Sequence, residues 1–263
     1  MILRDLHVHT TYCDGKNTPE EMVLSAIGKN MECIGFSAHS YTFFDESYCI
    51  KKDKISDYIT EINSLKDKYK EKIRILCGIE QDFYSDMPTS EFDYVIGSVH
   101  YIKIGNQYFS IDEHKEDFIK IAENYFDGDY YALAKAYFKS VADMAKSFKP
   151  DIIGHFDLIT KFNNGFNLFD ETDGNYQRVK KEAVDKILNL NIPFEINVGA
   201  ISRGYKLTPY PDIDTISYIA KNGGKLIFSG DVHTKDNLCY QFEKWHEILR
   251  ENGIDYEKIY FNI

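Results

Sequence analysis

Six of the eight histidines in the sequence lie at or just after the end of a short apolar segment, and two acidic residues follow the same rule. The eight residues with this placement are His7, His9, His39, Glu80, His100, His155, Asp231 and His233. Histidine is the commonest nitrogen ligand for transition metals, and carboxylates complete such sites. The pattern therefore predicts a polynuclear metal site and, with it, a hydrolase.

Two of these ligands form an HxH pair, His7-Val8-His9, at the end of the first apolar segment. In a strand, residues two apart point to the same side, so one ion can take both rings. Asp231-Val232-His233 is a second pair of this kind. Asp14 follows in a glycine-containing loop. By itself, an aspartate at such a position is more typical of a turn residue than of a metal ligand. A single histidine at a strand end is more often structural, but its recurrence on strand after strand favours metal ligation.

The apolar segments alternate with amphipathic ones along the whole chain, which predicts repeated βα units. The predicted strands are Leu3–Val8, Cys33–Ser37, Ile73–Ile79, Tyr94–Val99, Asp151–Gly154, Pro193–Val198 and Lys225–Ser229. Seven such units without a linker indicate an α/β fold with one closed, somewhat irregular barrel domain over residues 1–263. In a parallel barrel the strand ends converge on one face, which would gather the ligands. An open doubly wound sheet is the alternative, but it would not bring all the strand ends to one point.

Helices are predicted between the strands. The first begins at Thr18-Pro19-Glu20-Glu21, where Thr18 and Glu21 fit a capping box. The others are predicted at Asp53–Lys70, Asp112–Phe126, Tyr130–Phe148, Asn175–Leu190, Asp212–Asn222 and Leu238–Glu251, and 259–261 is a candidate terminal strand. Small residues precede several ligands, and we expect them to let the backbone crowd around the ions. These small residues are Gly78, Gly97, Gly154 and Gly230.

The composition restricts the possible partners. The 263 residues carry a formal net charge of −11, which argues against binding a nucleic-acid polymer. We find neither a signal peptide nor an apolar stretch long enough to span a bilayer. The five cysteines are odd in number and form no CxxC pair, which favours a reducing compartment. We therefore expect a cytoplasmic protein that acts on a small molecule and does not bind membranes.

The segment from Leu6 to Gly15, LHVHTTYCDG, resembles the opening motif of the PHP (polymerase and histidinol phosphatase) family, and the later ligands follow in that family's order. Phe194-Glu195-Ile196-Asn197, Arg203-Gly204-Tyr205 and Pro209-Tyr210-Pro211 are similar to its histidinol-phosphatase branch. The resemblance covers essentially the whole chain. It implies a distorted (β/α)7 barrel with the metal site at the C-terminal ends of the strands.

The resemblance also implies how the ligands divide among two to three divalent ions. One ion would take His7, His9, Glu80 and Asp231, a second would take Glu80 as a bridge with His100 and His155, and a third would take Asp14, His39 and His233. Some members carry a histidine near position 14 and an acid just before the second motif's histidine, where this chain has Asp14 and Ala38. The mixed histidine and carboxylate ligands suit Zn, Fe or Mn.

A phosphate-hydrolysing site also needs a cation from the protein. Arg203, in a glycine-containing loop after the sixth strand, is the first candidate because a guanidinium binds phosphate through two nitrogens. Lys161 is the second. Tyr41, with Asp45 and Glu46, is a candidate contact for the organic part of the substrate. The expected catalytic residues are Glu80, Arg203, Asp231 and His233, where one of the last two would help to protonate the leaving group.

The favoured function is hydrolysis of L-histidinol phosphate in histidine biosynthesis. Another PHP phosphoesterase, acting on small nucleotide or sugar phosphates, is the first alternative. A non-catalytic metal-stabilised module is the second, and few bound ions would favour it. An amidohydrolase-type enzyme that cleaves C–N bonds is the third, and it would not require Arg203. The sequence predicts no particular oligomeric state.

Overall fold

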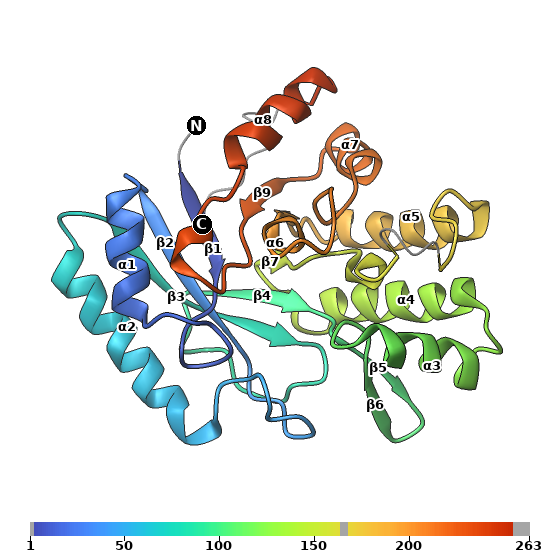
Figure 1. Cartoon of the computed structure of the whole chain (residues 1–263), viewed down its shortest axis with the longest axis horizontal. Coiled ribbons are helices and arrows are strands. Elements are labelled where there is room, and N and C mark those ends of the chain that lie inside the picture. The colour runs from blue at the N-terminus through green and yellow to red at the C-terminus, as the bar shows by residue number, and fades with distance from the viewer. Residues whose placement is uncertain (1–2, 164–167, 255–263) are drawn as a thin grey trace.

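The computed structural model describes residues 3–163 and 168–254, and its centre is one parallel seven-stranded sheet (Figure 1). The strands in spatial order are β1 (Arg4–Val8), β2 (Cys33–His39), β3 (Arg74–Asp82), β4 (Tyr94–Ser98), β7 (Ile152–Ile153), β8 (Phe194–Asn197) and β9 (Leu226–Ser229). Spatial order equals chain order, and every pairing is parallel. This is the predicted succession of βα units.

The sheet curls until its first and last strands meet. Just beyond β9, Val232 bridges Val8 in parallel, with the amide of His9 donating to the carbonyl of Val232 at 2.8 Å. Nearer the start of β1, the side chain of Asp5 takes the place of backbone hydrogen bonds between the first and last strands. Its carboxylate accepts from the amide of Gly230 at 2.8 Å and of Cys239 at 3.1 Å. The result is the predicted, nearly closed barrel with parallel strands.

The barrel is filled by side chains of its own strands. Tyr94 crosses the interior, and its hydroxyl donates to the carbonyls of Leu6 at 2.5 Å and Phe36 at 3.0 Å. A methyl group on Gly78 would collide with the Tyr94 ring. The interior is therefore a packed floor beneath the ends of the strands, and side chains at those ends face a common space.

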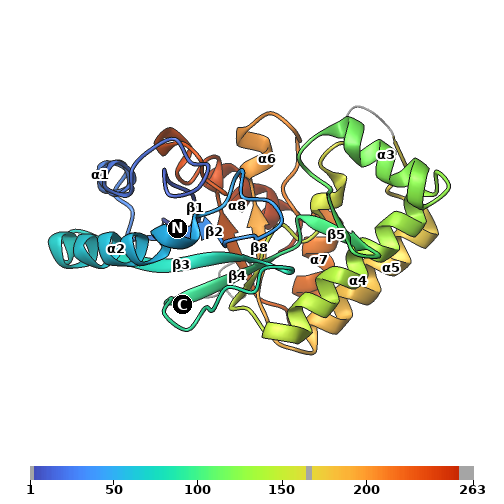
Figure 2. The ribbon, with the colours of Figure 1, turned by 90° about the horizontal axis from the view of Figure 1, so that it is seen from below.

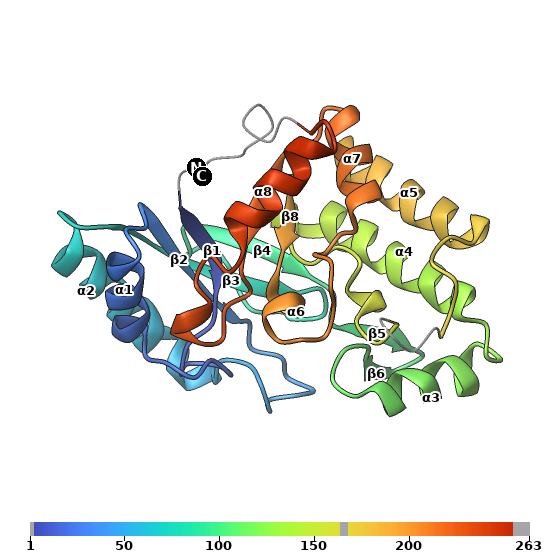
Figure 3. The same ribbon diagram turned by 45° about the horizontal axis from the view of Figure 1, so that its top comes forward.

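Helices surround the barrel. They are α1 (Pro19–Gly28), α2 (Ile55–Tyr69), α3 (Lys115–Tyr125), α4 (Tyr130–Phe148), α5 (Gly174–Leu188), α6 (Gly199–Ser202), α7 (Ile213–Lys221) and α8 (Phe242–Glu251). Helices α1 and α2 cover one side of the strands, and α4 and α5 lie together on the other (Figures 1 and 2). Figure 3 places α8 beside β8, and Phe242 of α8 stacks on Phe228 of β9 with 5.1 Å between ring centroids. The predicted capping box between Thr18 and Glu21 is present.

Several predicted boundaries differ from the structure. The segment after β4 forms a hairpin, β5 (Tyr101–Ile104) with β6 (Gln107–Ser110), which was not predicted from the sequence. The last helix begins at Phe242 and not at Leu238, because Cys239 and Gln241 adopt left-handed backbone conformations that no helix continues through. The candidate strand at 259–261 lies outside the described residues.

Across the described ranges, no helix is both long and apolar enough to cross a membrane. All five cysteines are free thiols.

Candidate metal centre

Five histidines from four strand ends surround one carboxylate, Glu80. Glu80 lies on β3 and is buried, and each of its oxygens faces histidine nitrogens. Its Oε2 lies 2.8 Å from His39 Nδ1, 3.3 Å from His7 Nε2 and 3.6 Å from His9 Nε2. Its Oε1 lies 2.8 Å from His155 Nε2 and 3.3 Å from His100 Nε2. Glu80 is thus placed to bridge two ions.

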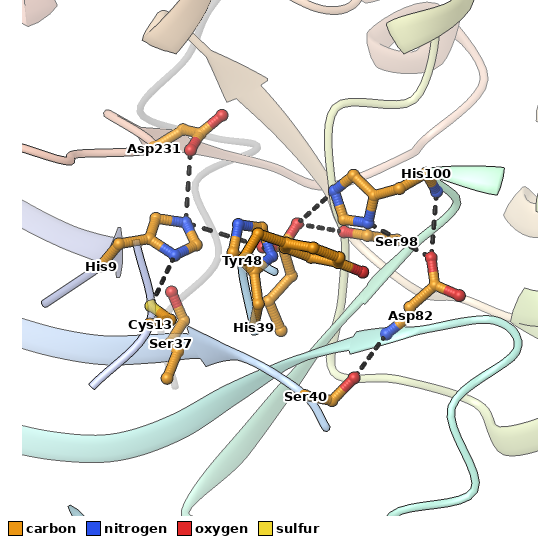
Figure 4. Close-up of polar contacts among 12 residues, drawn as sticks. His9, Cys13, Ser37, His39, Ser40, Tyr48, Asp82, Ser98, His100 and Asp231 are labelled. Atoms are coloured by element: carbon orange, nitrogen blue, oxygen red, sulfur yellow. Dashed lines mark hydrogen bonds and ion pairs between the residues drawn. The ribbon is translucent and has the colours of Figure 1, made fainter. Parts of the chain in front are cut away.

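The remaining predicted ligands adjoin this group through His9 and His39, and Figure 4 shows Asp231 beside His9. His9 Nε2 lies 3.3 Å from Asp231 Oδ1. Asp14 lies within 3.7 Å of His39 Nε2 and within 3.1 Å of His233 Nε2. The structure therefore brings all nine predicted ligands into one cluster at the C-terminal ends of the strands.

Three groups within the cluster could each hold a metal ion, because their ligand atoms lie within 4.8 Å of one another. The groups are His9 with Asp14, His39 and His233, then His7 with His9 and Glu80, and then His39 with Glu80 and His100. Apart from the ion-pair contacts within the cluster, four buried atoms of these three groups have no hydrogen-bond partner among the described residues: His7 Nε2, His9 Nε2, Asp14 Oδ1 and Glu80 Oε2. Leaving buried polar atoms unpaired is costly, and divalent ions would satisfy all four.

The cluster perturbs the pKa values of its members. Burial opposes the charged form of Glu80, but His7, His39 and His100 hold the pKa of its carboxyl well below the usual range. Burial disfavours the charged form of His7, yet the carboxylates of Glu195 and Glu80 raise its pKa well above the usual value. For His9, burial and the charges of His233 and His39 lower the pKa to about 3. His9 is therefore neutral at neutral pH, as a metal ligand must be.

Two acidic residues that are not among the predicted site residues contact the ligand histidines. Asp82 Oδ2 lies 3.2 Å from His100 Nδ1 and accepts from the amide of His100 at 3.1 Å. Glu195 Oε1 lies 2.6 Å from His7 Nδ1. Asp82 lies two residues after Glu80 on the same strand, so the side chains of both residues point to the same side. This spacing could have identified Asp82 from the sequence. Glu195 is far from His7 in sequence and drew attention only through the family resemblance.

The small residues before the ligands serve a different purpose from the expected one. Instead of making room for ions, they make room for other parts of the protein. A methyl group at Gly78 would meet the Tyr94 ring, one at Gly154 would meet Ser98, and one at Gly230 would meet Asp5. These glycines therefore allow close packing within the barrel wall.

An open cavity of about 390 Å³ lies over the cluster. Its lining includes six predicted ligands and both predicted cations, Arg203 and Lys161. Lys161 Nζ donates to the carbonyl of Asp112 at 2.5 Å and contacts its carboxylate at 3.1 Å. Tyr48 lines the cavity, whereas the hydroxyl of Tyr41 donates to Glu46 at 3.1 Å.

Three acidic residues of the lining, Asp45, Asp112 and Glu113, contribute carboxylates to the same cavity. Asp45 accepts from the hydroxyl of Tyr101 at 2.7 Å. The cavity therefore combines cationic side chains near the predicted ligands with acidic ones on its wall. The two remaining histidines lie elsewhere: His114 precedes α3 with an exposed side chain, and His246 lies in α8.

Comparisons with known proteins agree with this geometry. A family model described as the PHP domain matches residues 5–198. The histidinol-phosphatase of Bacillus subtilis is 23% identical over 266 residues, covering 93% of this chain and 98% of that protein.

Two solved structures share the fold. HisK from Listeria monocytogenes superposes with a TM-score of 0.80 at 19% identity, covering 92% of this chain and 99% of that one. Histidinol phosphate phosphatase from Lactococcus lactis, solved with zinc, L-histidinol and phosphate, gives a TM-score of 0.71 at 21% identity, covering 96% and 94%.

Proposed function

We propose that this chain, which belongs to the PHP family, is a metal-dependent phosphomonoesterase that hydrolyses L-histidinol phosphate to L-histidinol and phosphate in histidine biosynthesis. One observation carries the proposal: the nine predicted ligands meet beneath a cavity that Arg203 and Lys161 also line. The similarity to the B. subtilis histidinol-phosphatase along nearly its whole length favours this substrate over other phosphate esters.

Two to three ions of Zn, Fe or Mn would be held by His7, His9, Asp14, His39, Glu80, His100, His155, Asp231 and His233. Bound divalent ions generate a strong nucleophile from water at neutral pH and neutralise the charge on phosphoryl oxygens. Glu80 would bind two of the ions through its two oxygens. Three groups of mixed nitrogen and oxygen donors support this assignment, because such donors suit these metals.

The substrate phosphate would be oriented by Arg203, whose guanidinium reaches the cavity beside Asp231 and His233. Lys161, in the segment after the neighbouring strand β7, would add a second positive charge. A planar guanidinium with paired donors recognises phosphate with a fixed geometry. We assign to Arg203 the larger share of phosphate binding, because it contacts the predicted ligands Asp231 and His233, whereas Lys161 contacts Asp112 on the cavity wall.

L-Histidinol phosphate carries an ammonium group and an imidazole at its other end. The acidic wall formed by Asp45, Asp112 and Glu113 complements these groups. A simple phosphate ester such as p-nitrophenyl phosphate offers nothing to that wall. This complementarity in charge supports a phosphorylated amine as the substrate.

The test is phosphate release from a panel of monoesters after reloading the purified protein with Mn, Fe or Zn. The panel contains L-histidinol phosphate, p-nitrophenyl phosphate, a nucleoside monophosphate and a sugar phosphate. We expect the highest kcat/KM for L-histidinol phosphate. A higher kcat/KM for a nucleotide or sugar phosphate would favour the alternative PHP activity, and no hydrolysis with any metal would overturn the proposal.

A further inference from the structure

Strand β8 differs from the other six strands of the sheet because none of the nine predicted metal ligands lies on it or just after it. It nevertheless ends in two buried polar residues, Glu195 and Asn197, whose side chains point toward the ligand cluster. Glu195 is 1% exposed and Asn197 is fully buried. Burying a carboxylate is costly unless it is paired, so the partners of Glu195 indicate what it does.

Glu195 contacts two predicted ligands on two different strands. Its Oε1 lies 2.6 Å from Nδ1 of His7 on β1. Its Oε2 accepts from the backbone amide of His155, just after β7, at 2.9 Å. One carboxylate therefore fixes the ring of one ligand and the backbone of another.

The contact with His7 also fixes the tautomer of its ring. With Glu195 beside Nδ1, Nε2 is the ring atom left to bind an ion, and it faces Glu80 Oε2, 3.3 Å away. Within the described ranges His7 Nε2 has no hydrogen-bond partner, as expected of an atom reserved for a metal. Such carboxylate contacts orient ligand histidines and raise their basicity.

Asn197 extends the arrangement to a third ligand. Its Nδ2 donates to Glu195 Oε2 at 3.1 Å, and its Oδ1 accepts from the amide of Gly199 at 2.9 Å. A methyl group on Gly199 would collide with Asp231, so Gly199 packs directly against that ligand. Asp231 itself has a left-handed backbone (φ 47°), which its surroundings must hold in place.

We propose that Glu195 is a positioning residue for the metal centre. It does not bind an ion itself, but it orients His7 and His155, the two ligands that would bind ions on either side of Glu80. Strand β8 thus supplies orientation where the other strands supply ligands. The proposal concerns metal affinity and not the choice of substrate, so its failure would leave the phosphatase proposal standing.

The experiment compares the wild-type protein with Glu195→Gln and Glu195→Ala, each stripped with chelator and titrated with Zn²⁺ or Mn²⁺. We expect metal affinity to fall about 10- to 100-fold, the usual effect of losing a partner of a ligand histidine. Glu195→Gln should lose less than Glu195→Ala. Its amide oxygen can still accept from one of the two N–H groups but not from both.

A second readout separates positioning from a merely structural role. The absorption spectrum of the Co²⁺-loaded variants should change, since the orientation of a ligand ring alters the ligand field. Urea unfolding of the metal-free proteins then measures the stability of the fold itself. A variant that is less stable without metal, yet binds Zn²⁺ with wild-type affinity and keeps the wild-type Co²⁺ spectrum, would overturn the proposal.

A matched variant controls for charge. Asp112→Asn removes one half-buried negative charge near two predicted ligands, His100 and His155, without a hydrogen bond to either in the described structure. If charge alone mattered, Asp112→Asn and Glu195→Gln would weaken metal binding equally, and this result would contradict positioning by Glu195. We expect the loss to be clearly smaller for Asp112→Asn.

Discussion

Arg203 holds the carboxylate of Asp231 between its two terminal nitrogens: Nη2 donates to Oδ2 at 2.9 Å, and Nη1 to Oδ1 at 3.3 Å. Nη1 also lies 2.8 Å from His233 Nδ1. Burial opposes the charged form of Asp231, but Arg203 and His7 hold the pKa of its carboxyl well below the usual range. The predicted phosphate-binding cation is therefore in contact with two predicted metal ligands.

We predict that Arg203→Lys lowers kcat/KM for L-histidinol phosphate about 10- to 100-fold, the equivalent of about 1.5–3 kcal/mol for a hydrogen bond to a charged group. Lysine keeps the charge but loses the paired donors. Steady-state kinetics and inhibition by inorganic phosphate measure the effect. Metal content is determined in parallel, and a loss of metal with unchanged phosphate inhibition would mean that Arg203 serves Asp231 and not the substrate.

The position of Glu80 leads to the most damaging substitution. We predict that Glu80→Ala abolishes activity and lowers metal content, because five histidines face this one carboxylate and two ions would share it. Elemental analysis and phosphate release check both effects. Glu71→Ala, an exposed site after α2, is the control. Near-normal turnover of Glu80→Ala would show that the bridging assignment is wrong.

Metal binding and the stability of the metal-free fold should respond to pH with opposite signs. Burial disfavours charged His7, His39 and His100, but acidic neighbours raise the pKa of each. A folded-state pKa above the unfolded value gives stability that is complete below about pH 6.5 and is lost as pH rises through the folded pKa. His9, with its lowered pKa, opposes this trend and reduces its size.

Bound ions must displace the protons on these rings, so metal affinity should rise with pH. Between about pH 6 and pH 8 we expect the metal-free protein to become less stable while its affinity for Zn²⁺ increases. Urea unfolding with chelator and calorimetric Zn²⁺ titrations measure the two trends. Parallel trends, or a Zn²⁺ affinity independent of pH, would contradict protonated His7, His39 and His100 in the metal-free protein.

The fold and the ligand cluster could be predicted because both follow from local patterns. Apolar segments ending in His39, Glu80 or His100 mark strand ends, and parallel strands in a barrel bring those ends together. The hairpin of β5 and β6 does have a sequence signal, Gly105-Asn106 between two short β-type segments. The bond between Glu195 and His7 had none, because it joins residues 188 positions apart across the barrel.

The glycines before the ligands lead to a prediction about packing. We expect Gly78→Ala to destabilise the fold by about 1–3 kcal/mol, because the added methyl group overlaps the Tyr94 ring within the barrel. Urea unfolding at fixed metal concentration measures the loss. Gly28→Ala, at the end of α1 with open space around it, is the control. Equal stabilities of the two variants would show that the barrel interior repacks freely around residue 78.

Side-chain positions within the loops could not be read from the sequence. Its place after the second strand makes Tyr41 the candidate, whereas Tyr48 of the same loop lines the cavity and lies edge-on to His39, with 4.8 Å between ring centroids. Asp45, which was predicted together with Tyr41, does line the cavity. Loop conformation depends on contacts with the hairpin, such as the bond between Asp45 and Tyr101, which spans 56 residues.

Asp45 provides the last prediction, which concerns substrate preference. Asp45→Asn should lower the ratio of kcat/KM for L-histidinol phosphate to that for p-nitrophenyl phosphate about two- to fivefold, equivalent to about 0.5–1 kcal/mol for a partly exposed ion pair. Only the first substrate has a cationic group for the acidic wall, and asparagine can still accept from Tyr101. Asp53→Asn, an exposed site outside the cavity, should leave the ratio unchanged. An unchanged ratio in Asp45→Asn would remove Asp45 from substrate recognition, and the cationic end of the substrate would then have to meet Asp112 or Glu113.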